Sequence, residues 1–184
     1  PHTDAELLNQ RPFELNVPAN YDDSTPTPLV VVLHGLGGNG EQIVSYWGLE
    51  AAAERHGFLL AYPEGTRDSF GRKHWYGTDA CCTTDFNLPD DVGFLSVGLD
   101  DIEARLNVDG RQVFFVGHSN GGFMSHRMGC DRSSRVAAIV LLAGTSWKDP
   151  DHCKALEPVH VLQVHGDLDR GILFDGGIRQ GVAY

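Results

Sequence analysis

Short apolar runs alternate with helical patterns along most of the chain. Five runs rich in Val, Ile, Leu and Phe have the length of buried strands, and they cover residues 29–33, 58–62, 113–116, 137–143 and 159–164. Three stretches repeat apolar positions at helical spacing, at residues 40–56, 89–106 and 121–130. Strands separated by helices predict an α/β fold, with a mostly parallel sheet and helices on both faces. We expect a single domain over residues 1–184.

Residues 67–90 interrupt this rhythm with no periodicity of either kind, and they contain Trp75, Cys81 and Cys82. Long loops inside compact domains are usually functional or covalently pinned. The segment is therefore predicted to be a long, ordered loop.

The charge balance narrows the possible function classes. The 184 residues include 14 basic and 25 acidic side chains, for a formal net charge of -11. A nucleic-acid partner needs a basic surface that releases counterions from the phosphates, so this balance argues against DNA and RNA. The longest apolar run, residues 136–144, is far shorter than the roughly 20 residues of a membrane span. We expect neither a nucleic-acid partner nor a membrane segment.

The four cysteines, Cys81, Cys82, Cys130 and Cys153, fit no zinc-site spacing, so no metal site is predicted. A bridge between the neighbours Cys81 and Cys82 would be strained, which favours a distant partner for each of them, Cys130 and Cys153. Disulfides of this kind would indicate a secreted, extracellular protein. The alternative is four buried thiols in a reducing compartment.

Two glycine-rich turns follow predicted strands and compete to define the chemistry. The first, residues 35–40, matches G-x-G-x-x-G, and Glu64 lies 24 positions after Gly40, where a ribose-binding acid would stand. This pattern keeps an NAD-binding oxidoreductase as an alternative. His34, directly before the turn, is unusual for a nucleotide fold.

The second turn, residues 117–121, reads G-x-S-x-G between a strand and a helix, with Ser119 at its centre. A nucleophile on such a turn stands above the sheet, and the helix N-terminus favours a developing oxyanion. The alternative is that Ser119 is an ordinary helix N-cap.

A serine hydrolase also needs oxyanion donors and an acid. The backbone N–H groups of Leu36 and Asn120 are candidate donors, while Asp167 and Asp169 both follow the fifth predicted strand. All of these positions lie at the carboxyl ends of strands, where parallel α/β sheets carry their sites. The order of serine before aspartate is that of the α/β-hydrolases.

These motifs resemble the polyhydroxybutyrate depolymerase-like esterases, a group related to feruloyl and acetyl-xylan esterases. The resemblance runs from about residue 29 to residue 177, and it rests on residues 33–38, Trp75 with Cys81 and Cys82, and residues 91–95, 117–122, 143–144 and 165–169. It implies an α/β-hydrolase fold, Ser119 as the nucleophile and Asp169, rather than Asp167, as the acid. It leaves open polyesters, feruloylated or acetylated polysaccharides, and small esters as substrates.

The catalytic histidine of that family lies well downstream of the acid, whereas none of the nine histidines here follows Asp169. The resemblance therefore implies that the C-terminal strand and helix are missing from these residues. We expect the histidine on a companion chain, or on a segment that has been lost. Without a general base, hydrolysis by Ser119 should fall by several orders of magnitude.

Taken together, these features predict a secreted serine esterase that acts through an acyl-enzyme and needs no cofactor. Trp75 and Trp147 are candidate substrate-binding residues, although packing of their loops over the core explains them better than substrate binding does. A catalytically inactive polymer- or carbohydrate-binding module is the main alternative, and the NAD-binding oxidoreductase is a lesser one.

Overall fold

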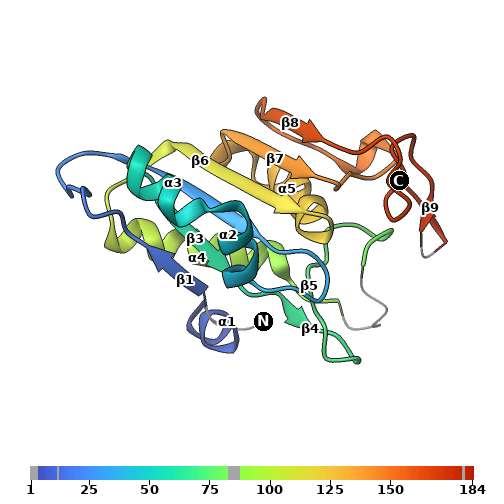
Figure 1. The fold of residues 1–184 in the computed structure, drawn as a ribbon, viewed down its shortest axis with the longest axis horizontal. Helices are drawn as coiled ribbons and strands as arrows, with labels where there is room; N and C mark the ends of the chain where they lie inside the picture. The colour runs from blue at the N-terminus through green and yellow to red at the C-terminus, as the bar shows by residue number, and fades with distance from the viewer. Residues whose placement is uncertain (1–3, 12, 83–87, 180) are drawn as a thin grey trace.

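Six strands form one sheet in the order β1-β3-β2-β6-β7-β8 (Figure 1). The computed structural model describes residues 4–11, 13–82, 88–179 and 181–184. β3 pairs antiparallel with β1, and the other neighbours pair parallel. The strands are β1 (Phe13–Asn16), β2 (Thr27–Leu33), β3 (Leu59–Pro63), β6 (Val108–His118), β7 (Ala138–Leu142) and β8 (His160–Val164).

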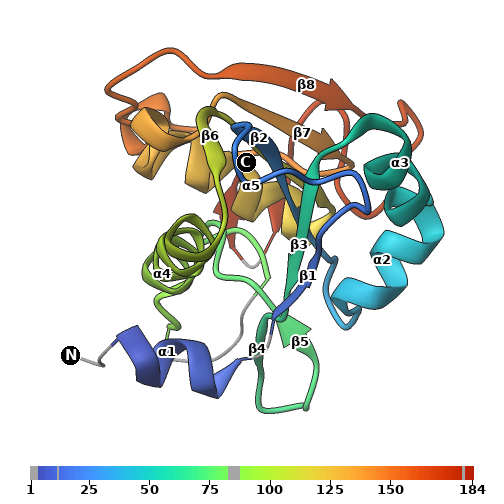
Figure 2. The same ribbon diagram turned by 90° about the vertical axis from the view of Figure 1, so that its left-hand side faces the viewer.

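Helices cover both faces of the sheet, with α2 and α3 on one side and α4 and α5 on the other (Figure 2). The α-helices are α1 (Asp4–Gln10), α2 (Gly40–Trp47), α3 (Leu49–His56), α4 (Asp91–Arg105) and α5 (Asn120–Asp131). The 3-10 turns are η1 (Ser133–Arg135) and η2 (Pro150–His152). Two small ladders join β4 (Thr66–Arg67) to β5 (Lys73–His74) and β9 (Ile178–Arg179) to β10 (Val182–Ala183). The predicted α/β class with a mostly parallel sheet is confirmed.

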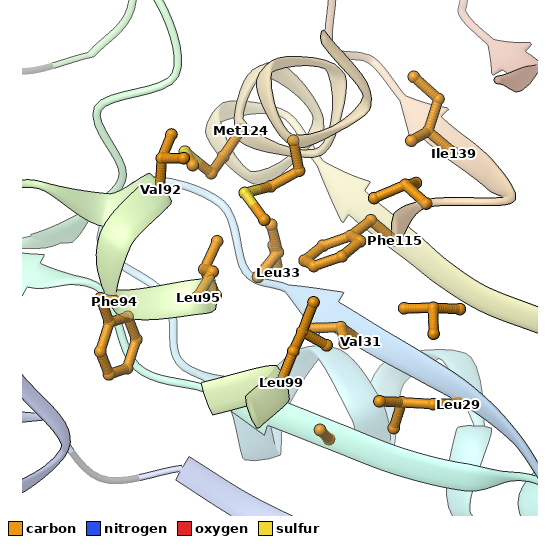
Figure 3. Close-up of a cluster of buried hydrophobic side chains, with 14 of the residues drawn as sticks. Leu29, Val31, Leu33, Val92, Phe94, Leu95, Leu99, Phe115, Met124 and Ile139 are labelled. Carbon is orange, nitrogen blue, oxygen red and sulfur yellow. The ribbon is translucent and has the colours of Figure 1, made fainter. Parts of the chain in front are cut away.

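The alternation of side chains along β2 explains how the two layers are held. Leu29, Val31 and Leu33 point to the side of α4 and α5, where they meet Leu99 and Phe115 (Figure 3). The intervening Val32 packs on the opposite face against α2 and α3. Successive strand residues alternate between faces, so a strand covered by helices on both sides must be apolar throughout.

The single helix predicted over residues 40–56 is wrong, because two helices meet there at Gly48. Gly48 has φ +65° and donates its N–H to the carbonyls of Ser45 and Val44, which ends α2. This left-handed conformation is open to glycine without steric cost. The break lets each short helix follow the twisted sheet separately.

The predicted loop over residues 67–90 contains β5 and a bridge between Thr78 and Cys81, while residues 83–87 lie outside the described part. At the other end of the sheet, β8 pairs only with β7 within the described part of the chain, and all five of its residues are exposed. They include Val161 and Leu162, each 57% exposed. No helix among the described residues is long and apolar enough to cross a membrane.

The predicted cysteine pairing is also wrong, since the disulfides join Cys81 to Cys82 and Cys130 to Cys153. The sulfur of Cys81 lies 3.8 Å from the side-chain nitrogen of Asn120, at the start of α5. Cys130 stands ten residues further along that helix, a rise of about 15 Å. A disulfide spans less than about 7 Å between Cα atoms, so the two pairs form at opposite ends of α5.

Candidate active site

Ser119 occupies the sharp turn between β6 and α5, with φ 52° and ψ -118°. Residues with a Cβ rarely adopt this combination of φ and ψ, and those that do cluster at functional sites. The Ser119 N–H donates to the carbonyl of Leu142 at 2.8 Å, and the Ser119 carbonyl accepts from Gly122 at 2.8 Å. The structure thus holds the turn from both sides. It makes Ser119 the residue before the first turn of α5, but its side chain caps no N–H.

The glycines around Ser119 allow the backbones to approach each other. A Cβ on Gly117 would collide with the carbonyl of Gly121, and a Cβ on Gly121 would collide with the carbonyl of Leu33. A Cβ on Gly144 would stand 2.7 Å from Cα of Gly122. These obstacles are backbone atoms, which cannot swing aside as a long side chain can. The G-x-S-x-G pattern therefore reflects how tightly β6, α5 and β2 meet.

The first glycine-rich turn, residues 35–40, faces the turn that bears Ser119 across a cleft. The carbonyl of Gly35 accepts hydrogen bonds from Nδ1 of His34 at 2.8 Å and from the N–H of Gly38 at 3.0 Å. In a trans peptide the next N–H points the opposite way, so the N–H of Leu36 is turned away from His34. Within the described part of the chain, no hydrogen bond uses the backbone N–H of Leu36 or Asn120. Leu36 lines the cleft, so its N–H is available to a ligand there, whereas Asn120 is fully buried.

An ion pair supports the same turn from behind. Lys73 Nζ lies 2.6 Å from Glu64 Oε2, and Glu64 Oε1 accepts from the N–H of Gly40 at 3.2 Å. The carbonyl of Lys73 accepts from the N–H of Gly37 at 2.8 Å. The structure thus gives Glu64, the candidate ribose ligand of the alternative reading, a bracing role in residues 35–40.

His34 is a buried part of this support. Its Nε2 accepts from the N–H of Gly65 at 3.0 Å, so the ring proton is on Nδ1, which donates to Gly35. Burial lowers the pKa of His34 below its ordinary value. A neutral ring is what this pair of hydrogen bonds requires, because the protonated form has no acceptor nitrogen.

Asp169 follows β8 and is held by backbone donors. One carboxylate oxygen, Oδ1, accepts from the N–H groups of Gly171 at 2.7 Å and Ile172 at 3.1 Å. These two bonds lower the pKa of Asp169, and His165 and His118 lower it further. The carboxylate is therefore ionised at neutral pH. Asp167, the other candidate, is exposed and has no polar partner among the described residues.

Neither His165 nor His118 is hydrogen-bonded to Ser119 in the described part of the chain. His165 Nε2 lies 2.7 Å from the carbonyl of Ile172, and its Nδ1 lies 3.1 Å from the amide nitrogen of Gln163, so this ring braces the Asp169 loop. His118 lines the cleft, and burial lowers its pKa. In the part of the chain that the structure describes, no histidine nitrogen is hydrogen-bonded to the Ser119 hydroxyl.

The cleft between the two turns has a volume of about 430 Å³, within the range of small-molecule sites. Ser119 and Leu36 line its floor, and α2 supplies Gln42, Ile43 and Tyr46. Sequence reasoning missed these α2 residues. Tyr46 follows Gln42 by four residues and Ile43 by three, which puts them on one helix face, and this spacing was the available signal.

The two tryptophans proposed to bind substrate do not line this cleft. Trp75 is fully buried, and its indole N–H donates to the carbonyl of His34 at 3.1 Å, so it has no surface to offer a substrate. Its backbone N–H and carbonyl bond the Asn120 side chain at 2.7 and 2.8 Å, which ties its loop to the start of α5. For Trp75 the expectation is wrong. Trp147 lines a different cleft.

The ring of His126 and the sulfurs of Cys130 and Cys153 come within 4.8 Å of one another. Both sulfurs belong to a disulfide, so neither is a thiolate that could bind a metal ion.

Comparison with known proteins places this geometry in context. The family model for the alpha/beta hydrolase fold matches residues 28–163. Feruloyl esterase C of Emericella nidulans is 30% identical over 177 residues, which cover 93% of this chain and 59% of that protein. The chain spans about half the length of the curated relatives it matches.

Solved structures share the fold. A thermostable esterase superposes with a TM-score of 0.71 at 18% identity, over 90% of this chain and 45% of its own. A ferulic acid esterase from Anaeromyces mucronatus, in complex with ferulic acid, superposes with a TM-score of 0.60 at 19% identity, over 86% of this chain and 67% of its own.

Proposed function

This chain belongs to the alpha/beta hydrolase fold family, and we propose that it carries the nucleophile, oxyanion donors and acid of a serine carboxylic ester hydrolase. The observation that carries the proposal is Ser119 at φ 52°, on a strand-to-helix turn that shares a cleft with Leu36. The ionised Asp169 and the unused N–H groups of Leu36 and Asn120 support it. The relatives described as feruloyl esterases agree with this class of reaction.

In the proposed reaction, Ser119 Oγ attacks the ester carbonyl while a histidine takes its proton. The N–H groups of Leu36 and Asn120 stabilise the oxyanion, and losing one such donor typically costs about 10²–10³-fold in rate. The alcohol then leaves with that proton, and an acyl-enzyme remains. Water attacks the acyl group by the reverse proton path and releases the acid. Asp169 orients the histidine and stabilises its charged form.

The histidine is proposed to come from polypeptide outside these 184 residues. No described histidine is hydrogen-bonded to Ser119, and the ring nitrogens of His34 and His165 already have structural partners. Among the described residues the edge of β8 is unpaired, its exposed side chains include Val161 and Leu162, and Asp169 follows five residues after its end. A segment paired to β8 would therefore pass next to Asp169. The intact mass of the native and the denatured protein distinguishes a companion chain from a continuous longer one.

We propose feruloyl-type esters as the first substrate class to test. The relatives' names support this choice, and the exposed ring of Tyr46 at the cleft offers a surface for an aromatic acyl group. Ratios of kcat/KM for methyl ferulate, p-nitrophenyl acetate and a hydroxybutyrate oligomer would rank feruloyl, acetyl and polyester substrates.

A fluorophosphonate probe followed by peptide mass mapping tests the nucleophile. We expect the adduct on Ser119, no adduct in Ser119→Ala, and ordinary labelling in Ser134→Ala, which removes an exposed hydroxyl elsewhere. An adduct on another residue would refute the assignment. Binding of a feruloylated oligosaccharide without labelling or turnover would favour the inactive binding module, and a fluorescence titration with NADH addresses the oxidoreductase alternative.

Secretion is part of the proposal, because disulfides such as Cys130–Cys153 persist mainly in oxidising compartments. Mass spectrometry after thiol alkylation of the protein from its native source provides the test. Alkylation of all four cysteines without prior reduction would contradict it.

A further inference from the structure

A second cleft, of about 440 Å³, lies beside the far part of α5 and shares no lining residue with the Ser119 cleft. Three segments form it: the loop at residues 76–79, the outer face of α5, and the segment around η2. Arg127 and Asp131, which line it, stand eight and twelve residues after Ser119 on one helix. That spacing corresponds to about 12–18 Å along the helix axis, so this cleft is separate from the ester site.

One wall of the second cleft is a braced aromatic ring. Trp147 lies between His126 and His152, with ring centroids 6.4 and 6.0 Å apart and both pairs edge to face. The disulfide Cys130–Cys153 ties this segment to the end of α5. A half-buried indole held in this way offers a fixed apolar surface to a ligand.

A second aromatic ring that lines the cleft, that of Tyr76, has its own support. The Arg127 guanidinium lies 4.9 Å from the centroid of the Tyr76 ring and donates to the Tyr76 carbonyl at 2.8 Å. The Tyr76 hydroxyl donates to Asp79 at 2.5 Å. Burial, the largest cause, and the nearby Asp79 raise the pKa of Tyr76 to about 12, so this hydroxyl stays protonated.

Polar groups in the cleft have unused hydrogen-bonding capacity. The Thr78 hydroxyl is buried and has no partner among the described residues, which is costly unless a ligand or water supplies one. Three more polar groups of the cleft make no hydrogen bond or ion pair among the described residues: the Trp147 indole N–H, the Lys154 ammonium and the Asp151 carboxylate. The cleft thus has both donors and acceptors to offer.

The charges in the cleft nearly cancel, so they give an ion of either sign little net attraction. Three carboxylates, from Asp79, Asp131 and Asp151, would repel an anion, and Arg127 is already paired with Asp131 at 3.2 Å. Lys154, which has no ion pair among the described residues, would in turn disfavour a cation. Two aromatic surfaces with interspersed donors and acceptors suit a molecule that has apolar C–H faces and many hydroxyls.

We propose that this cleft binds neutral sugar units of a polysaccharide, as a recognition site apart from the ester-cleaving cleft. The choice of a polysaccharide rests on the proposed function, since a sugar polymer that carries ester groups is long enough to contact both clefts. Sugar units bound at Trp147 would hold the polymer close to Ser119.

Titration calorimetry with xylohexaose tests the proposal, with cellohexaose and mannohexaose as the other neutral backbones. We expect at least one to bind the wild type, and Trp147→Ala and Asp151→Asn each to weaken that binding at least tenfold. Asp151→Asn removes a charge from an exposed side chain, so it remains informative if Trp147→Ala does not fold. Phe70→Ala, which removes an exposed ring outside both clefts, and Tyr46→Ala, in the ester cleft, should bind as the wild type does.

Unchanged binding in folded Trp147→Ala, loss of binding in Tyr46→Ala alone, or no binding of any hexaose to the wild type would overturn the proposal. Fluorophosphonate labelling of Ser119 should persist in Trp147→Ala. Failure of the proposed function is a separate result, because it would abolish labelling and turnover in the wild type and leave sugar binding intact.

Discussion

Replacing Ser119 by glycine should stabilise the fold while it abolishes hydrolysis. Ser119 has φ 52° and ψ -118°, where a residue with a Cβ costs on the order of 1–3 kcal/mol. Glycine adopts this conformation freely, but it gives the unfolded chain about 0.4–1 kcal/mol of extra entropy to lose. The hydroxyl makes no hydrogen bond within the described residues, so its removal adds no further cost. The net expectation is a gain of about 1 kcal/mol.

Urea unfolding followed by circular dichroism measures this difference. Ser119→Ala keeps the Cβ, so its free energy of unfolding should equal that of the wild type within about 0.5 kcal/mol. Ser134→Gly is the matched control at an exposed position with ordinary negative φ, and it should lose about 0.5–1 kcal/mol. Both Ser119 variants should be inactive towards esters. If Ser119→Gly is no more stable than Ser119→Ala, the turn is not strained by the Cβ and this reasoning fails.

Three further predictions concern the supports of the site. Glu64→Gln removes the ion pair with Lys73, which braces residues 35–40, the oxyanion turn that carries the Leu36 N–H. Because this turn would loosen, we expect kcat for ester hydrolysis to fall about tenfold, with a smaller change in KM. Replacing Cys130 and Cys153 together by alanine opens a loop of sequence separation 23, and urea unfolding should show a loss of about 3 kcal/mol. The lowered pKa of His34 means that its contribution to stability is present above pH 6.5 and is lost as the pH falls through its lower folded value. A proton NMR titration of the His34 ring should therefore show a midpoint below 6.5.

Each of these has a clear contrary result. A purely KM effect in Glu64→Gln would mean that the ion pair shapes the substrate cleft and not the oxyanion turn. Unchanged unfolding of the cysteine variant would show that the crosslink constrains little of the unfolded chain. A midpoint for His34 at or above 6.5 would mean that water reaches the ring.

Features that rest on local backbone geometry could be predicted from the sequence. The runs rich in Val, Ile, Leu and Phe identified five strands of the sheet. The G-x-S-x-G pattern indicated the turn that bears Ser119, because no residue with a Cβ fits at Gly117 or Gly121. The strand β1 at the sheet edge went unpredicted. Its four residues have a mixed burial pattern, and antiparallel pairing with β3 decides its conformation.

Features that depend on tertiary contacts could not be predicted. The helix break at Gly48 follows from how α2 and α3 pack on the twisted sheet, and helical periodicity runs straight through it. Disulfide pairing required the length and position of α5, which separates Cys81 from Cys130. The full burial of Trp75 required the Asn120 side chain, 45 positions away, that bonds its backbone.

The close approaches at the elbow affect how tolerance to mutation should be interpreted. Gly117, Gly121 and Gly144 each face backbone atoms that leave no room for a methyl group. A saturation scan of this region would therefore show intolerant positions that never touch a substrate. Selection at these positions would act against any side chain, because none fits. An invariant glycine beside Ser119 would report the distance between β2, β6 and α5, and would carry no information about which ester the protein cleaves.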